Sequence, residues 1–105
     1  MGGFKFMLAQ LRTYTINKGM MDKWLELFYD ELVPRVIEAG MGIPTVAVNH
    51  ENTKFIWIRT FENEADIEVK EAAFYGSEWW KDNVDHVRTH LAHREIELID
   101  LQPSP

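Results

Sequence analysis

The segment Lys54–Phe61 constrains the fold more than any other part of the chain, because it reads as a strand with two apolar faces. Side chains alternate between the two faces of a strand. One row of this segment is therefore Ile56, Ile58 and Thr60, and the other is Phe55, Trp57, Arg59 and Phe61. Both rows are too apolar to face solvent, so the sheet that contains this strand has to be covered on both sides.

The first half of the chain predicts one strand and one long helix. Residues 5–16 are mostly β-branched, aromatic or aliphatic, which favours a strand. Apolar residues at offsets of three and four then predict an amphipathic helix over 21–39. Pro34 should kink its last two turns because proline lacks the N–H. Gly40 and Gly42 can take the left-handed conformation that ends a helix.

The second half predicts a hairpin, a broken helix and a last strand. The hairpin spans 45–50 and 54–61, the helix spans 63–75 and 77–91, and the strand spans 95–101. Asn63 and Ser77 are good N-caps, and Gly76 separates the two helical parts. The order βαββαβ is the ferredoxin-like arrangement, an α+β fold. It fills a single domain over residues 1–105, with 102–105 as an extended tail.

This order also predicts a homodimer. Right-handed crossovers place both helices on one face of a four-stranded antiparallel sheet, with the strands over 5–16 and 54–61 in its centre. The other face is then bare, although both rows of 54–61 are apolar. We therefore expect a second copy of the chain to cover that face.

The composition restricts the partners. The 105 residues include 11 Lys+Arg and 17 Asp+Glu, a net charge of −6 with no basic cluster, which argues against a nucleic-acid partner. The absence of Cys removes disulfides, thiolate nucleophiles and Cys-ligated metals. The first eight residues do not resemble a signal peptide, and no apolar stretch approaches membrane-spanning length. We therefore expect a cytoplasmic protein, with no membrane partner, that binds a small molecule or another protein.

The row of large aromatics around Arg59 predicts a pocket. Arginine does not normally lie beneath helices without a carboxylate partner or a solvated cavity. We assign six residues to a pocket between sheet and helices: Gln10, Arg12, Tyr14, Trp57, Arg59 and Phe61. Two guanidinium groups on adjacent strands could hold a carboxylate, phosphate or enolate, with aromatic walls around it. The alternative pairs both arginines with helix carboxylates such as Glu31 or Asp66.

A histidine stripe is the other candidate for chemistry. His86, His90 and His93 are spaced by four and three, which could suit a metal. His93 falls past the predicted helix end and no H-E-x-x-H pattern occurs, so we predict no metal site. We expect His86 or His90 to reach the pocket rim as an acid–base group. Trp79 lies off the apolar stripe and is assigned to the ligand.

Several motifs resemble the NIPSNAP family. Residues 10–16 (QLRTYTI) and 31–34 (ELVP) resemble its opening strand and helix. Residues 55–61 (FIWIRTF) and 75–80 (YGSEWW) resemble its third strand and second helical region. The resemblance implies a dimeric α+β barrel, in which two sheets pack face to face.

The same superfamily contains cofactor-free antibiotic-biosynthesis monooxygenases and haem-degrading monooxygenases, which place a substrate between sheet and helices. The haem-degrading members use an Asn, a Trp and a His. The matching positions here are Gln10, Phe61 and Val84, so the resemblance disfavours haem degradation. Only the location of the pocket carries over, as an analogy.

Two functional hypotheses follow. The first is a homodimer that binds a small anionic or aromatic molecule and, without a cofactor, transforms it as an oxygenase, isomerase or cyclase. Arg12 and Arg59 would stabilise an anion, Tyr14 would donate a hydrogen bond, and a histidine would move a proton. The alternative is a non-enzymatic protein-interaction module whose helical face around Val33 and Ile37 docks a partner. A packed interior without a cavity would favour that alternative.

Overall fold

A computed structural model describes residues 6–105; Lys5, the predicted start of the first strand, lies outside them. The elements are β1 (Met7–Ile16), α1 (Met21–Leu27), η1 (Phe28–Leu32), α2 (Val33–Glu38), β2 (Gly42–Val48), β3 (Lys54–Phe61), α3 (Glu64–Tyr75), α4 (Glu78–Arg88) and β4 (Leu91–Leu101). Since α1, η1 and α2 are contiguous and α3 and α4 are the two parts of the broken helix, the predicted βαββαβ order is confirmed. Among the described residues, no helix is both long and apolar enough to span a lipid bilayer.

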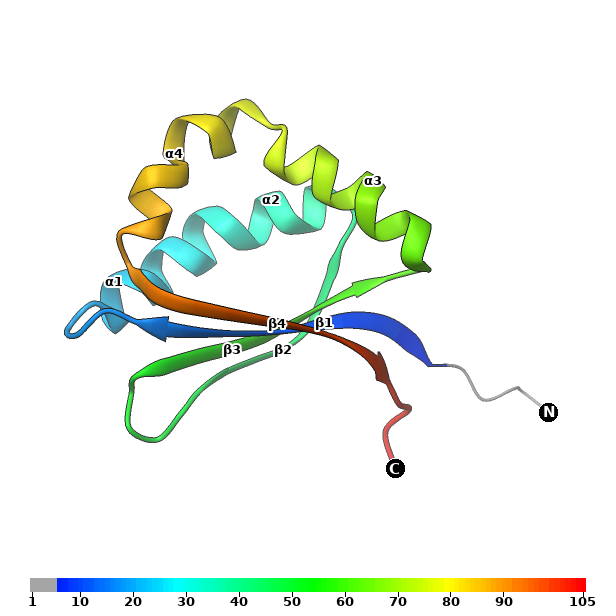
Figure 1. Cartoon of the computed structure of the whole chain (residues 1–105), viewed down its shortest axis with the longest axis horizontal. Helices are drawn as coiled ribbons and strands as arrows, with labels where there is room; N and C mark the ends of the chain where they lie inside the picture. The colour runs from blue at the N-terminus through cyan, green and yellow to red at the C-terminus, as the bar shows by residue number, and fades with distance from the viewer. Residues whose placement is uncertain (1–5) are drawn as a thin grey trace.

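The four strands form one antiparallel sheet in the order β2-β3-β1-β4, with β1 and β3 in the centre as predicted. All helices lie on the same side of this sheet (Figure 1). The register pairs Gln10 with Arg59 and Arg12 with Trp57. Paired residues point to the same face of a sheet, so these four side chains meet beneath the helices.

The opposite face of the sheet has no helix over it in the described part of the chain (Figure 1). Its central strands present a half-buried apolar surface that includes Leu11, Ile56 and Ile58. On β4, at the edge, the same face carries the exposed Glu95 and Glu97. This face is therefore apolar in the middle and acidic at one margin.

The first helical region changes its winding close to the proline that predicted a kink. It contains a π-helical turn, Phe28–Leu32, which ends two residues before Pro34. Pro34 has no N–H to donate to the Asp30 carbonyl, and a wider turn accommodates that missing bond. Arg35 Nη1 donates to the Glu31 carbonyl oxygen at 3.0 Å and so satisfies part of the widened turn.

The end of this helix uses one of the two glycines predicted for it. Gly40 has φ +100° and takes the left-handed conformation. Gly42 instead begins β2, where an added Cβ would lie 2.5 Å from Thr60 Oγ1. A glycine at this position therefore lets β2 lie close to the Thr60 side chain of β3.

The predicted caps of α3 and α4 are confirmed, but the last strand begins earlier than predicted. Asn63 Oδ1 accepts a hydrogen bond from the Asp66 N–H at 2.9 Å, and Ser77 Oγ accepts one from the Trp80 N–H at 3.2 Å. Helix α4 ends at Arg88, and β4 starts at Leu91 instead of at 95. Much of β4 is exposed because it is an edge strand, so its polar start carried no hydrophobic signal.

The core lies between the sheet and the helices. Phe28 packs against Phe55 and Trp57, and Trp24 packs against Phe55, with ring centroids 4.6 to 5.5 Å apart. Such edge-to-face ring contacts stabilise a core beyond the area they bury. The aromatic packing forms the floor and one wall of the site described next.

Candidate functional site

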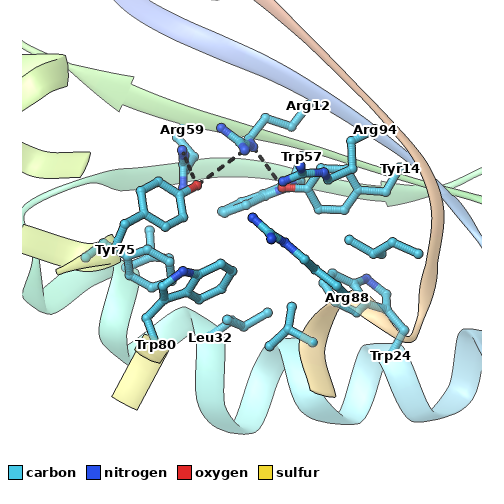
Figure 2. A pocket seen from close by; sticks show the side chains of 14 residues that line it. Arg12, Tyr14, Trp24, Leu32, Trp57, Arg59, Tyr75, Trp80, Arg88 and Arg94 are labelled. Atoms are coloured by element: carbon cyan, nitrogen blue, oxygen red, sulfur yellow. Dashed lines mark hydrogen bonds between the residues drawn. The ribbon is translucent and has the colours of Figure 1, made fainter. Parts of the chain in front are cut away.

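Four of the five arginines in the chain line one cavity between the sheet and the helices (Figure 2). They come from four elements: Arg12 from β1, Arg59 from β3, Arg88 from α4 and Arg94 from β4. The chain as a whole has a net charge of −6. A cavity that gathers most of the arginines of an acidic protein is a place where negative charge is attracted.

This inner cavity is narrow and adjoins a wider hollow. It has a volume of about 30 Å³, room for a water molecule or two. An outer hollow of about 420 Å³ lies on the β4 side. Residues that line both are Arg12, Tyr75, Trp80, Arg88 and Arg94. The inner cavity and the outer hollow are therefore parts of one site, which we call the arginine site.

A single carboxylate, Glu71 on α3, holds the two buried arginines. Its Oε2 lies 2.7 Å from Arg59 Nη2 and 3.8 Å from Arg12 Nη1. Gln10 Oε1 accepts hydrogen bonds from Arg12 Nη1 at 2.7 Å and from Arg59 Nη2 at 3.0 Å. Arg59 also lies 5.3 Å from the Trp57 ring centroid, within cation–π range. The two guanidinium groups are thus fixed side by side.

Two tyrosines complete this network as acceptors. Tyr14 Oη accepts from Arg12 Nε at 2.8 Å, and Tyr75 Oη accepts from Arg59 Nη2 at 3.1 Å (Figure 2). Burial opposes the charge on Arg12, but Tyr14, Tyr75 and Glu71 outweigh it, so the pKa of Arg12 is raised above its usual value. Because an arginine only donates, each phenol keeps its own O–H free to donate elsewhere.

Two tryptophans that line this site carry buried indole N–H groups. Trp24 and Trp57 both line the inner cavity, and the Nε1 of each is buried without an acceptor among the described residues. Buried polar groups are normally hydrogen-bonded. The residues that line the site therefore offer guanidinium and phenol donors against the one carboxylate of Glu71.

The structure brings together most of the pocket residues predicted from the sequence. Arg12, Tyr14, Trp57 and Arg59 line the inner cavity, and Gln10 lines the outer hollow. Phe61 is buried on the same face of the sheet, opposite Leu8, but is not among the lining residues.

Other predicted residues lie elsewhere. Trp79 lies at a different surface hollow, where the guanidinium carbon of Arg35 is 4.4 Å from the centroid of the Trp79 ring. His86 and His90 line a hollow on the α1 side, and His90 Nδ1 lies 3.0 Å from the His86 carbonyl oxygen. Neither histidine lines the arginine site, so their location gives no support to the predicted acid–base role. Within residues 6–105, no three His, Asp or Glu side chains are grouped to hold a metal ion.

The alternative prediction, that both arginines pair with a helix carboxylate, is confirmed, but the carboxylate is Glu71 and not Glu31 or Asp66. Glu31 pairs with Arg35 at 3.1 Å, and Asp66 pairs with Lys70 at 2.8 Å, each within its own helix. Both are local i,i+4 pairs, which form without any tertiary contact. Glu71 pairs with Arg12 and Arg59 because it lies further along α3 than Asp66 does, over the middle of the sheet.

The residues of this site that sequence reasoning missed include Glu71, Tyr75, Trp80, Arg88 and Arg94. Two periodic signals could have found some of them. Trp80 and Arg88 lie eight residues apart, on the same face of one helix. Arg94 lies two residues before Ile96, on the face of β4 that the register turns toward the helices.

The fold and the site define an α+β protein with an arginine-lined cavity between sheet and helices. Solved structures that share this fold include NIPSNAP family proteins. One, a NIPSNAP domain protein from Burkholderia xenovorans, has a TM-score of 0.80 at 16% identity, over 93% of this chain and 95% of that one. Another, a NIPSNAP family protein of unknown function from Agrobacterium tumefaciens, has a TM-score of 0.84 at 17% identity, over 94% and 92% of the two chains.

A further solved structure shares the fold at a lower TM-score. A structure described as an antibiotic biosynthesis monooxygenase has a TM-score of 0.68 at 20% identity, over 92% of this chain and 100% of that one. No protein-family model matches the chain, and no curated protein matches it. These similarities show that the chain has the fold of the NIPSNAP structures, and they leave activity to be argued from the site.

Proposed function

We propose that this protein is a homodimer that binds a small organic anion in the arginine site. The observation that carries the proposal is the charge of the site: four guanidinium groups face one carboxylate, 4 − 1 = +3. Two of these groups, Arg12 and Arg59, are buried, and an unbalanced charge is costly there because water is restricted. A bound anion would remove part of that cost, and arginine is the side chain best suited to hold one.

The other lining groups support an anion with an apolar or aromatic body. The phenol donors would satisfy carboxylate or enolate oxygens, which only accept. The remaining walls include Trp57, Phe74 and Trp80, which favour contact with an apolar surface. A ligand of this kind fits better than an inorganic anion, which would leave the aromatic walls without contact.

Binding and charge stabilisation are the roles that this geometry supports. Arg12, Arg59 and Tyr75 could stabilise the negative charge that develops on an enolate. No histidine lines the site among the described residues, and Glu71, the one carboxylate there, is engaged by two arginines. If the protein is an enzyme, we propose a cofactor-independent oxygenase, isomerase or cyclase. The similarity to an antibiotic biosynthesis monooxygenase structure is consistent with that class.

The uncovered sheet face supports the dimer. An apolar surface of two central strands is rarely left in water. A second copy placed on it would bury Leu11, Ile56 and Ile58 of both chains. Because the arginine site lies on the opposite side of the sheet, dimerisation and ligand binding would be separable by mutation.

Calorimetric titration with phenylacetate, a small aromatic monoanion, tests the proposal. We expect saturable binding that Arg59→Ala weakens at least about tenfold, because a charge-assisted hydrogen bond is worth about 1.5–3 kcal/mol. Arg35→Ala is the matched control, since Arg35 lies outside the site and should leave binding unchanged. Loss of the dimer in Arg59→Ala would show instead that this arginine is structural. Absence of binding to phenylacetate and to the dianion used below would overturn the proposal.

A further inference from the structure

We infer that the ligand is a two-ended dianion, with one acidic group held by Arg12 and Arg59 and a second held by Arg88 and Arg94. This inference rests on the proposed function and narrows it to a class of ligand. The four arginines do not form one ring of equivalent charges. They form an inner pair and an outer pair that differ in burial and in partners.

The inner pair is buried and organised. Arg12 and Arg59 are 3% and 1% exposed, on adjacent central strands. They share Glu71 and Gln10, so their positions are fixed before any ligand arrives. The charge of this pair with Glu71 is 2 − 1 = +1, which matches one carboxylate.

The outer pair is exposed and has no counter-charge. Arg88 ends α4 and Arg94 lies near the start of β4, and both line the inner cavity and the outer hollow. Neither forms an ion pair within residues 6–105. The side chain of Arg88 points from α4 into the space bounded by Trp57, Tyr75 and Trp80 (Figure 2). Two unpaired guanidinium groups at one mouth match a second anionic group.

Aromatic side chains line the space that the two pairs share. Tyr75 and Trp80 line both the inner cavity and the outer hollow. They would contact the part of a ligand that joins its two acidic ends, so this part should be apolar or aromatic. A monoanion would leave a site charge of 3 − 1 = +2, whereas a dianion would leave 3 − 2 = +1.

The volumes set the direction of entry. The inner cavity of about 30 Å³ admits at most an acidic group, while the outer hollow of about 420 Å³ can hold a ring and a second acidic group. One end of the ligand would therefore reach the inner pair, with the other end left at the mouth. Arg88 would swing outward to pair with that end, and this motion would widen the inner cavity.

Paired titrations test this inference. The probes are phenylacetate and 1,4-phenylenediacetate, which share a ring and an acetate group and differ in the second acetate. We expect the dianion to bind the wild-type protein about tenfold more tightly, because one added charge-assisted contact is worth about 1.5–3 kcal/mol. The double variant Arg88→Gln/Arg94→Gln should remove the higher affinity for the dianion. It should change the affinity for phenylacetate less than about threefold. Arg35→Gln, which removes a guanidinium outside the site, should keep the advantage.

The outcomes separate the two proposals. Equal affinity for both probes would overturn the dianion inference and leave the proposed anion site intact. An equal loss of affinity for both probes in the double variant would also overturn the inference, because the outer pair would then act only by general electrostatic attraction. Binding of neither probe would overturn the proposed function itself. If the double variant does not fold, the single variants Arg88→Lys and Arg94→Gln give the same comparison, with part of the advantage lost in each.

Discussion

Arg59 Nη2 and Glu71 Oε2 lie 2.7 Å apart, and this contact ties the centre of the sheet to α3. Arg59 is 1% exposed and Glu71 is 28% exposed, so the pair has a buried cation and a partly solvated anion. Glu71 also approaches Arg12, which makes it the counter-charge for two guanidinium groups. The stability of the protein and its affinity for an anion are therefore expected to be coupled through this carboxylate.

Glu71→Gln should lower the free energy of unfolding by about 1–3 kcal/mol, because it leaves two buried guanidinium groups without a counter-charge. Urea denaturation at neutral pH measures the change. The control is Glu68→Gln, an exposed residue of the same helix, which should stay within about 0.5 kcal/mol of wild type. Phenylacetate should stabilise Glu71→Gln more than wild type, since the anion replaces the missing charge. A variant as stable as wild type would show that water already balances these arginines.

Ile58→Lys should dissociate the proposed dimer without unfolding the chain. Ile58 lies on the uncovered sheet face, and an unpaired charge buried there from each copy would cost about 3 kcal/mol or more. The dimer Kd should then rise at least about a hundredfold, as measured by sedimentation or light scattering. Ile37→Lys is the control, because Ile37 is 56% exposed on the helical side. If both variants and wild type sediment alike, the sheet face is not the interface; if Ile37→Lys alone dissociates the protein, the helical face is.

Asp66 should stabilise the fold at neutral pH and lose that effect in acid. Its Oδ2 accepts hydrogen bonds from the Glu62 N–H at 2.9 Å and from Lys70 Nζ at 2.8 Å, and these lower the pKa of Asp66 in the folded chain. A lowered folded pKa adds stability above the unfolded pKa, about 3.9 for Asp, and that stability is lost as the pH falls through the folded pKa. Asp66→Asn should thus be less stable than wild type at pH 7, and the gap should close in acid. A gap that is independent of pH would assign the effect to hydrogen bonding alone.

The order of elements could be predicted from the sequence because each carries its own local signal. The alternating rows of 54–61, the caps Asn63 and Ser77, and the break at Gly76 depend on neighbours along the chain, and the structure has all of them. The start of β4 could not be predicted in the same way. It is an exposed edge strand, and its pairing with β1 comes from backbone hydrogen bonds that leave little trace in the side chains.

The inner half of the arginine site was also predictable, since Arg12 and Arg59 stand out among apolar neighbours on central strands. The outer half was not, because exposed arginines such as Arg88 and Arg94 occur on any surface. What makes them part of a site is the position of α4 over the sheet, which depends on tertiary packing. The same packing turns Trp79 away from the site and Trp80 toward it, although the two are adjacent.

Intrinsic tryptophan fluorescence should report ligand binding. Of the four tryptophans, Trp24, Trp57 and Trp80 line the arginine site and Trp79 does not. A bound anion beside Trp57 and Trp80 would change their emission, so titration with 1,4-phenylenediacetate should give a saturable signal. Trp79→Phe should keep that signal, whereas Trp57→Phe should lose much of it. The signal should also weaken as salt is added, because screening reduces the attraction between the arginines and the anion. A signal that survives Trp57→Phe but disappears in Trp79→Phe would place the ligand on the Arg35 side of the helices instead.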